Sequence, residues 1–397
     1  PMHGVDEPKH VAAKKAALDG TLYTAANGYD GPAIGRGDGI ISIGTYGSLG
    51  APSSGLLSLV EGVADEIEKA GLFPTTDVFL YAIDETCSSP YGAGWKSLID
   101  GSANANVKKV KVGWTCSIDP SKQPVDLPIV FAGSFNATTA AAARTAGKDV
   151  WIYNGYRPST GTFLTDAEAT SLRANGWIAA TQDIGRWFYW ETAFWYDGNR
   201  GGLGPYDPFV TAETFHNSDG DQCQGDGVLV YPGKQVDDFS EHSVGFAGVF
   251  ASIRLKNLRR GIEDAGYFQL AHAADAAKAD AIAKGVLGKV LGEAAHGTPP
   301  AYAQTGKPWF DARKSLADLI PKETPGGDAG PSDGGADSGG GDGGPAGDGS
   351  TNGAEGGGES SGCGCDVPGR AAGGSALALL ACAGAAILRR RRVQKIA

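Results

Sequence analysis

The stretch that decides the fold is Asp77-Val-Phe-Leu-Tyr-Ala-Ile-Asp84-Glu85, an apolar run that ends on two adjacent carboxylates. A continuous apolar run of this length, preceded by a turn signal at Pro74, predicts a strand buried on both faces, as in parallel sheets. Ligands meet such sheets at the carboxyl ends of the strands. Asp84 and Glu85 are therefore predicted to lie where a substrate arrives. The alternative is that Asp84 caps the next helix and Glu85 is only solvated.

Similar segments alternate on both sides of this run. Strand-like runs occupy residues 40–47, 107–115, 127–132, 149–155, 185–191 and 226–233, and helical spacing occurs at 53–71, 136–147, 165–182, 252–274 and 276–292. Strands that alternate with helices predict a parallel sheet with crossover helices. The length favours a (β/α)8 TIM-like barrel over an open sheet, and its N-terminal part could be missing.

The chain divides by composition into five parts. An irregular segment at 1–38 precedes the barrel at 39–300 and a C-terminal extension at 301–323. Residues 324–362 consist almost entirely of Gly, Asp, Ser, Ala and Pro, which cannot bury a core, so this part is predicted to be a disordered linker. Residues 363–397 form a tail.

The tail combines Cys363, Cys365, an uncharged segment at 371–388 and four arginines from Arg389. Eighteen residues in a helix reach about 27 Å, enough to cross a bilayer core, and the arginines would stay cytoplasmic. The alternative is a helix that lies on a surface or in a core. The pattern resembles the C-terminal sorting tails of myxobacterial surface proteins. That resemblance implies processing by a sorting protease at Cys363 or Cys365, and an exported protein anchored in the membrane at the cell surface.

The net charge of -11 argues against a nucleic-acid partner, which would require a basic face. Much of this charge is local, because acidic residues between Lys322 and Arg370 have no basic counterpart. The charge of the folded part therefore says little about its ligand, and no cofactor is expected.

Two cysteines, Cys87 and Cys116, each lie just past the end of a predicted strand, and the two strands are successive. Neighbouring strand ends could bring them within disulfide range, and two buried thiols are the alternative. Cys223 lies in a polar loop with His216, Asp219, Asp221 and Asp226. A calcium or zinc site in this loop is an open alternative, but the spacing of Asp219 and Asp221 is too loose to predict a metal.

Several segments together resemble the catalytic domain of family 123 glycoside hydrolases, which are β-N-acetylhexosaminidase-like enzymes on a (β/α)8 barrel. The segments are Phe79–Glu85, Trp151–Tyr153, Trp187–Trp190, Gly225–Gly233 and Ser252–Asp264. The resemblance implies that Glu85 is the general acid/base and that Asp84 orients and stabilises the 2-acetamido group of the substrate. Arg254, Glu263 and Asp264 could contact the sugar or form an ion network on a helix surface.

Aromatic residues fit a sugar site independently of that resemblance, because aromatic faces bind the C–H faces of pyranose rings. The candidates are Trp151, Tyr153, Trp187, Tyr189 and Trp190. Side chains alternate along a strand, so only half of residues 187–190 can face the interior of a barrel. The sequence does not say which half.

These features predict a surface-anchored glycosidase that cleaves N-acetylhexosamine glycosides. Adjacent carboxylates can hardly flank a sugar, whereas a retaining enzyme with a protein nucleophile holds its carboxyls about 5–5.5 Å apart on opposite sides of the bond. The expected mechanism is therefore substrate-assisted, with the acetamido oxygen as nucleophile and Tyr153 or Tyr189 as its hydrogen-bond donor. Two alternatives are a non-catalytic carbohydrate-binding or adhesive protein and a glycosidase for a different sugar.

Overall fold

The computed structural model describes residues 2–31, 33–116, 119–194, 208–209, 211–216, 222–233, 245, 248–295 and 298–321. The predicted linker at 324–362 and the tail at 363–397, with Cys363, Cys365 and the apolar segment 371–388, lie outside the described residues. Of the helices within those ranges, none combines the length and the apolar character needed to cross a membrane.

Seven parallel strands form one sheet, with neighbours in chain order. The strands are β1 (Met2–Val5), β2 (Ile40–Ile43), β3 (Asp77–Asp84), β4 (Lys111–Thr115), β5 (Leu127–Phe131), β6 (Trp151–Tyr153) and β7 (Trp187–Phe188). The predicted parallel α/β architecture is confirmed, and the order is that of a (β/α) barrel. Over the described ranges no eighth strand joins the sheet, so it is a curled seven-stranded sheet rather than the eight-stranded barrel that the sequence predicted.

The N-terminal segment is not irregular, which corrects the prediction for residues 1–38. β1 pairs in parallel with β2, from Met2 opposite Ile40 to Val5 opposite Ile43, and α1 (Pro8–Leu18) follows it. A short 3-10 helix, η1, spans Ala25–Asn27. β1 has four residues and α1 buries only Val11 and Leu18, so neither element carries a periodic apolar pattern that a sequence reading can detect.

Residues 226–233, expected to form another strand of the barrel, lie outside the parallel sheet. Their strand, β10 (Val230–Pro232), pairs antiparallel with β11 (Val249–Ala251). β10 is three residues long and ends on a proline, which has no N–H to give to a further strand. A local two-stranded ribbon results, and β8 (Glu213–His216) and β9 (Gln222–Gln224) form a second one.

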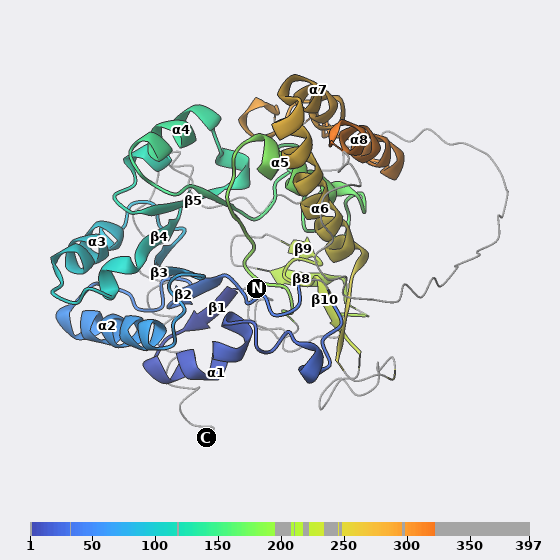
Figure 1. Ribbon diagram of the computed structural model, residues 1–397. Helices are drawn as coiled ribbons and strands as arrows, with labels where there is room; N and C mark the ends of the chain where they lie inside the picture. The colour runs from blue at the N-terminus through green and yellow to red at the C-terminus, as the bar shows by residue number, and fades with distance from the viewer. Residues whose placement is uncertain are drawn as a thin grey trace. The chain divides into compact units, whose positions relative to one another are not determined.

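Helices cover the outer face of the sheet, as Figure 1 shows for the first four helices. The helices after α1 are α2 (Ser54–Lys69), α3 (Tyr91–Gly101), α4 (Ala137–Thr145), α5 (Ser171–Thr181), α6 (Ile253–Ala274), α7 (Ala276–Leu287) and α8 (Gly306–Leu319), and the last three pack with α5 and with one another. In α2 the Ser53 side chain caps the helix by accepting from the Leu56 amide, and the stripe of Val60, Val63 and Ile67 is buried.

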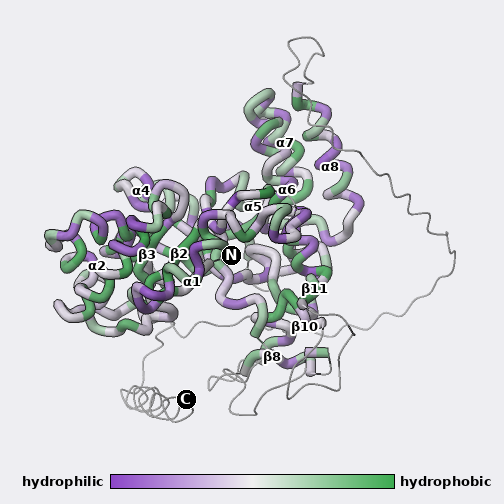
Figure 2. Tube along the Cα trace, turned by 60° about the horizontal axis from the view of Figure 1, so that its bottom comes forward, coloured by the Kyte–Doolittle hydropathy of each residue, from purple (hydrophilic) through white to green (hydrophobic). Residues whose placement is uncertain are grey.

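Two cores lie between the helices and the sheet. One joins α1, α2 and α3 to β1–β4, and the other joins α4 through α8 to β5 and β6. The hydropathy colouring in Figure 2 shows apolar strands β2 and β3 beside helices whose other sides are polar. Val78, Leu80 and Ala82 belong to the first core, so these three residues of β3 point outward to the helices.

The inner face of the sheet carries large aromatic side chains that touch across several strands. Phe79 of β3 lies 5.4 Å from Trp151 of β6, and Tyr81 of β3 lies 5.8 Å from Phe188 of β7, measured between ring centroids. In a flat sheet β3 and β6 would be about 14 Å apart and β3 and β7 about 19 Å apart. The sheet is therefore strongly curled, and this curl brings the carboxyl ends of β6 and β7 toward the end of β3.

Candidate active site

A break in the β3–β4 register sets the direction of Asp84. Tyr81 is opposite Gly113, but Ile83 is opposite Trp114 and Asp84 is opposite Thr115, so Ala82 is an extra residue in β3. Without this bulge, simple alternation would point Asp84 outward with Leu80 and Ala82. With it, Asp84 shares the inner face with Tyr81 and Thr115.

Two hydroxyl groups hold the Asp84 carboxylate. The Tyr81 hydroxyl donates to Asp84 Oδ1 at 2.7 Å, and Thr115 Oγ1 donates to the same oxygen at 2.9 Å. The two hydroxyl oxygens are 3.1 Å apart. Neither Tyr81 nor Thr115 was among the site residues predicted from sequence, although Thr115 ends the next strand along the chain, where polar residues of a parallel sheet converge.

Glu85 begins the loop after β3 in a left-handed conformation, with φ 51°. Such a φ is uncommon for a residue other than glycine and requires support from its surroundings. The Glu85 amide is held by Thr115, at 3.0 Å from its carbonyl oxygen and 3.1 Å from its Oγ1. Tyr153, on β6, donates to Glu85 Oε1 at 3.1 Å.

Burial raises the pKa of the Glu85 carboxyl above its usual value. The negative charge of Asp84 raises this pKa further, and the hydrogen bond from Tyr153 opposes both effects. A carboxyl with a raised pKa, next to a second carboxyl, has the properties of a general acid.

A disulfide joins Cys87 to Cys116, with their Cα atoms 5.4 Å apart. Cys87 comes two residues after Glu85, and Cys116 directly follows Thr115. The bond therefore connects the two strand ends that carry the carboxylates and one of the hydroxyl groups that bind Asp84.

The loop after β2 also reaches the site, and no sequence pattern predicted this. Tyr46 has φ 50°, and its hydroxyl donates to the Trp190 carbonyl at 2.7 Å. Burial of that hydroxyl raises its pKa, as do the charges of Glu191 and Asp84. A Cβ built on Gly47 would lie 3.3 Å from the Asp84 nitrogen, so this glycine lets the loop lie against the end of β3.

Of the five predicted aromatic residues, all of them within the described ranges, only Tyr153 forms a hydrogen bond with Glu85. Trp151 is 1% exposed and packs edge-on against Phe79 in the inner core, so it offers no ring face to a ligand. Trp187 donates from Nε1 to the Asn154 carbonyl at 2.7 Å and packs against the helical core. Phe188 takes the inner-face position of β7 instead.

Tyr189 and Trp190 belong to a second polar cluster around Asp226. The Tyr189 ring stacks on Phe163 at 3.8 Å, and its hydroxyl donates to Asp226 Oδ1 at 2.8 Å and accepts from the Gly227 amide at 2.6 Å. Trp190 also bonds to Asp226, whose pKa burial raises. The Tyr189 hydroxyl thus donates to Asp226, whereas the Tyr153 hydroxyl donates to Glu85, one of the two adjacent carboxylates.

Arg254 and Asp264 do not lie on an exposed helix surface, and their roles differ from the predicted network. Arg254 is buried and donates to the carbonyls of Phe163, Gly225 and Val228. These bonds attach the loop that contains Asp226 to the first turn of α6. Asp264 is fully buried and pairs with Arg173 and Arg313. Glu263 pairs with Arg313 near the surface.

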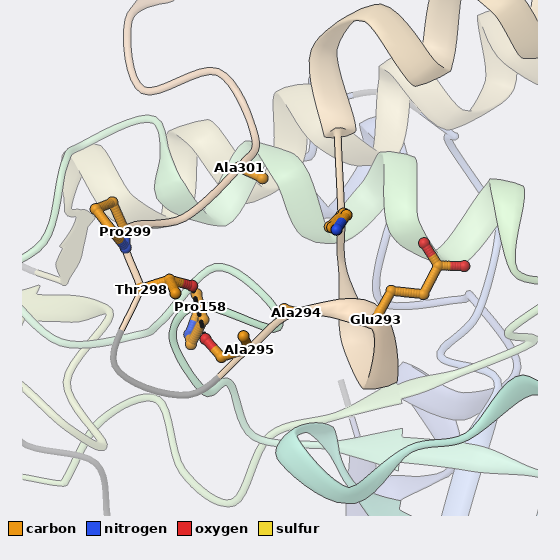
Figure 3. A pocket seen from close by; sticks show the side chains of 8 residues that line it. Pro158, Glu293, Ala294, Ala295, Thr298, Pro299 and Ala301 are labelled. Carbon is orange, nitrogen blue, oxygen red and sulfur yellow. Dashed lines mark hydrogen bonds between the residues drawn. The ribbon is translucent and has the colours of Figure 1, made fainter.

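Metal ligands do not converge in the part of the chain that the structure describes, where no group of three or more His, Cys, Asp or Glu residues could hold an ion. Cys223 is buried, and Asp219 and Asp221 lie outside the described residues. A pocket of about 160 Å³ is lined by residues that include Pro158, Lys289 and Glu293. Figure 3 shows Pro158 and Glu293 at this pocket. Neither Asp84 nor Glu85 lines it, so the site described above is a different one.

Residues 97–271 match the family model described as the glycoside hydrolase 123 catalytic domain. The matched segment is less than half of the chain and begins after Glu85, so it includes Thr115, Tyr153 and Asp226 but not the two carboxylates. The match supports the glycosidase activity that the sequence predicted. No curated protein matches the chain.

Among solved structures, a family 123 glycoside hydrolase from Clostridium perfringens, described in a study of glycolipid glycan hydrolysis, is similar at 14% identity and a TM-score of 0.44. The alignment covers 67% of this chain and 44% of that enzyme, so the chain spans less than half of the enzyme's length.

Proposed function

We propose that the protein is a retaining glycosidase that cleaves N-acetylhexosamine glycosides, with the 2-acetamido group of the substrate as nucleophile. The observation that carries this proposal is the adjacency of Asp84 and Glu85 at one strand end. Both carboxylates reach the sugar from one side, whereas protein-nucleophile and inverting mechanisms require carboxylates on opposite sides of the bond.

In the proposed reaction, protonated Glu85 donates its proton to the leaving oxygen while the acetamido oxygen attacks the anomeric carbon. An oxazolinium-like ring forms and the glycosidic bond breaks. Asp84 accepts a hydrogen bond from the acetamido N–H, and its negative charge balances the positive charge that develops on the ring. Glu85, now a carboxylate, then takes a proton from the water that opens the ring, which restores the starting state with retained configuration.

Two features of the site support these roles. Burial and the charge of Asp84 raise the pKa of Glu85, so its acid form is more populated than that of an exposed glutamate at the same pH. The Tyr153 hydroxyl, which donates to Glu85 Oε1, is placed to turn to the acetamido oxygen when substrate binds.

A screen of nitrophenyl glycosides tests the proposal, with Asp84→Asn as the low-activity control, because nitrophenyl leaving groups need little protonation by Glu85. We expect hydrolysis of N-acetylhexosaminides only, a first product with retained configuration, and inhibition by a thiazoline that mimics the oxazoline. Turnover only of sugars without an N-acetyl group would support a glycosidase for a different sugar. Binding of glycans without any turnover would support a carbohydrate-binding protein. Inverted product would reject the mechanism.

Export and anchoring are a separate part of the proposal and rest on the sequence of the tail. We propose that the tail places the protein at the cell surface, with its membrane segment at 371–388 and processing at Cys363 or Cys365. Removal of residues 363–397 should release an active protein, and replacement of both cysteines should mislocalise it. Unchanged surface location of the double cysteine variant would reject the sorting tail, and loss of activity on truncation would reject the separation of anchor and catalytic domain.

A further inference from the structure

The two oxygens of the Asp84 carboxylate have different surroundings. Oδ1 accepts hydrogen bonds from Tyr81 and from Thr115, at 2.7 and 2.9 Å. Within the ranges that the structure describes, Oδ2 has no hydrogen-bond partner. The two oxygens of a carboxylate are chemically equivalent, so this asymmetry comes from the protein around them.

Both donors are fixed in place. Tyr81 is 2% exposed, and its ring packs against Phe79 and Phe188 on the inner face. Thr115 is 1% exposed, and its Oγ1 accepts from the Glu85 amide at 3.1 Å. Asp84 Oδ1, at 2.9 Å, is the nearest acceptor for the Thr115 hydroxyl hydrogen, since the Tyr81 hydroxyl lies at 3.1 Å and the Ile83 carbonyl at 3.4 Å.

The donors also keep their hydrogens. Burial raises the pKa of the Tyr81 hydroxyl well above its ordinary value, and the charge of Asp84 raises it further. A threonine hydroxyl does not ionise in this range. Both hydroxyl groups are therefore protonated, and able to donate, around neutral pH.

We propose that Tyr81 and Thr115 are positioning residues, which bind Asp84 Oδ1 so that Oδ2 alone is presented to the N–H of a 2-acetamido group. This inference rests on the proposed function and narrows the substrate class, because the 2-substituent must supply a hydrogen-bond donor. The bulge at Ala82 makes the arrangement possible, since it puts Asp84 on the face that carries both hydroxyl groups. The carboxylate then does not have to rotate when positive charge develops, which is the preorganisation that electrostatic catalysis requires.

The test compares Tyr81→Phe and Thr115→Val with two matched variants. Thr115→Ser keeps the hydroxyl. Tyr302→Phe removes an equally buried tyrosine hydroxyl, which donates to the Thr160 carbonyl at 3.2 Å in the helical core. With a nitrophenyl N-acetylhexosaminide, Tyr81→Phe and Thr115→Val should each lower kcat about ten- to a hundredfold, the range expected for a hydrogen bond to a charged group, with little change in KM. Thr115→Ser and Tyr302→Phe should stay near the wild-type kcat.

A double variant separates positioning from general damage. In an Asp84→Asn background, Tyr81→Phe should lower the remaining rate less than about twofold, because its effect passes through the carboxylate. Two results would overturn the inference and leave the proposed function intact. One is an equal kcat for Tyr81→Phe and Tyr302→Phe. The other is a fall in kcat on adding Tyr81→Phe to Asp84→Asn that is as large as the fall in the wild-type protein. A wild-type protein that hydrolyses no N-acetylhexosaminide would overturn both.

Discussion

Asp84 and Asp264 are two carboxylates with opposite kinds of surroundings. Asp264 is fully buried in α6, accepts from Arg173 Nε at 2.6 Å and Nη2 at 3.2 Å, and also bonds to Trp177 Nε1 at 2.8 Å and to Arg313. Asp84 is partly exposed at a strand end, and two neutral hydroxyl groups donate to one of its oxygens.

The difference indicates what each carboxylate does. Two guanidinium groups compensate the charge of Asp264 and use both of its oxygens, so it ties α5, α6 and α8 together and has no capacity left for a ligand. The hydroxyl groups around Asp84 orient the carboxylate without neutralising it. Asp84 therefore retains both a charge and an acceptor for a substrate.

Replacement of the reactive carboxylates should give the largest effect on activity. Asp84→Asn should lower kcat/KM for N-acetylhexosaminides about 10³- to 10⁴-fold, for activated and poor leaving groups alike, because formation of the intermediate is impaired. Glu85→Gln should abolish turnover of poor leaving groups but partly spare activated aryl glycosides, which need less protonation. Steady-state kinetics on both substrate types measure the contrast. An Asp84→Asn variant that keeps a tenth of wild-type activity would contradict it.

Replacement of Asp264 should affect stability instead. Asp264→Asn leaves the buried Arg173 without its anion and removes the buried partner of Arg313, so it should lower the free energy of unfolding by about 3–5 kcal/mol, as measured by denaturant unfolding. The activity of each folded molecule should not change. Asp311→Asn is the control, because its pair with Lys307 is exposed and should contribute less than about 0.5 kcal/mol. A fall in kcat for folded Asp264→Asn would erase the distinction between the two carboxylates.

Loss of the disulfide should lower both the free energy of unfolding and the catalytic activity. Cys87→Ala combined with Cys116→Ala opens a loop with a sequence separation of 29, which in the chain-entropy model contributes about 3–4 kcal/mol to the free energy of unfolding. Because the bond joins the strand ends next to Glu85 and Thr115, kcat should also fall. Unfolding and kinetics on the same samples distinguish this result from that of Asp264→Asn. Lower stability with wild-type kcat would show that the bond does not help to position the site.

The smallest expected effect is a shift in pH dependence. Glu85 must be protonated to act as an acid, so kcat falls as the pH rises through its pKa. The Tyr153 hydrogen bond favours the carboxylate and lowers that pKa, so Tyr153→Phe should raise it and move the alkaline limb of the kcat profile to higher pH, by up to about one unit. A limb that moves to lower pH would mean that another group controls it.

The sequence predicted the elements that depend on local pattern. The apolar run before Asp84 indicated a buried strand, and its alternation with helical segments indicated a parallel sheet with crossover helices. The proximity of Cys87 and Cys116 also followed, because residues just past successive parallel strands are neighbours at one edge of a sheet. Each of these inferences needs only residues that are close in sequence or elements that are adjacent in order.

Other features were decided by contacts between distant residues, and the sequence could not supply them. Strict alternation would turn Asp84 toward the helices, and only the pairing of β3 with β4 shows the extra residue that turns it inward. The curl of the sheet brings Tyr153 to Glu85 and puts Phe188 rather than Trp187 on the inner face. Asp264 looked like a surface charge because a helical pattern does not reveal that a second helix, α8, covers it with Arg313.

The sequence by itself thus determined which residues carry charge. It also showed that some of these residues follow strand ends, which lie together at one edge of a parallel sheet. The tertiary structure decided which oxygen of Asp84 is occupied and which carboxylate is neutralised. The physical reason is that hydrogen bonds and charge compensation act over about 3 Å, whereas the partners of Asp84 and Asp264 include residues from other strands and helices. Local sequence pattern cannot fix distances on that scale.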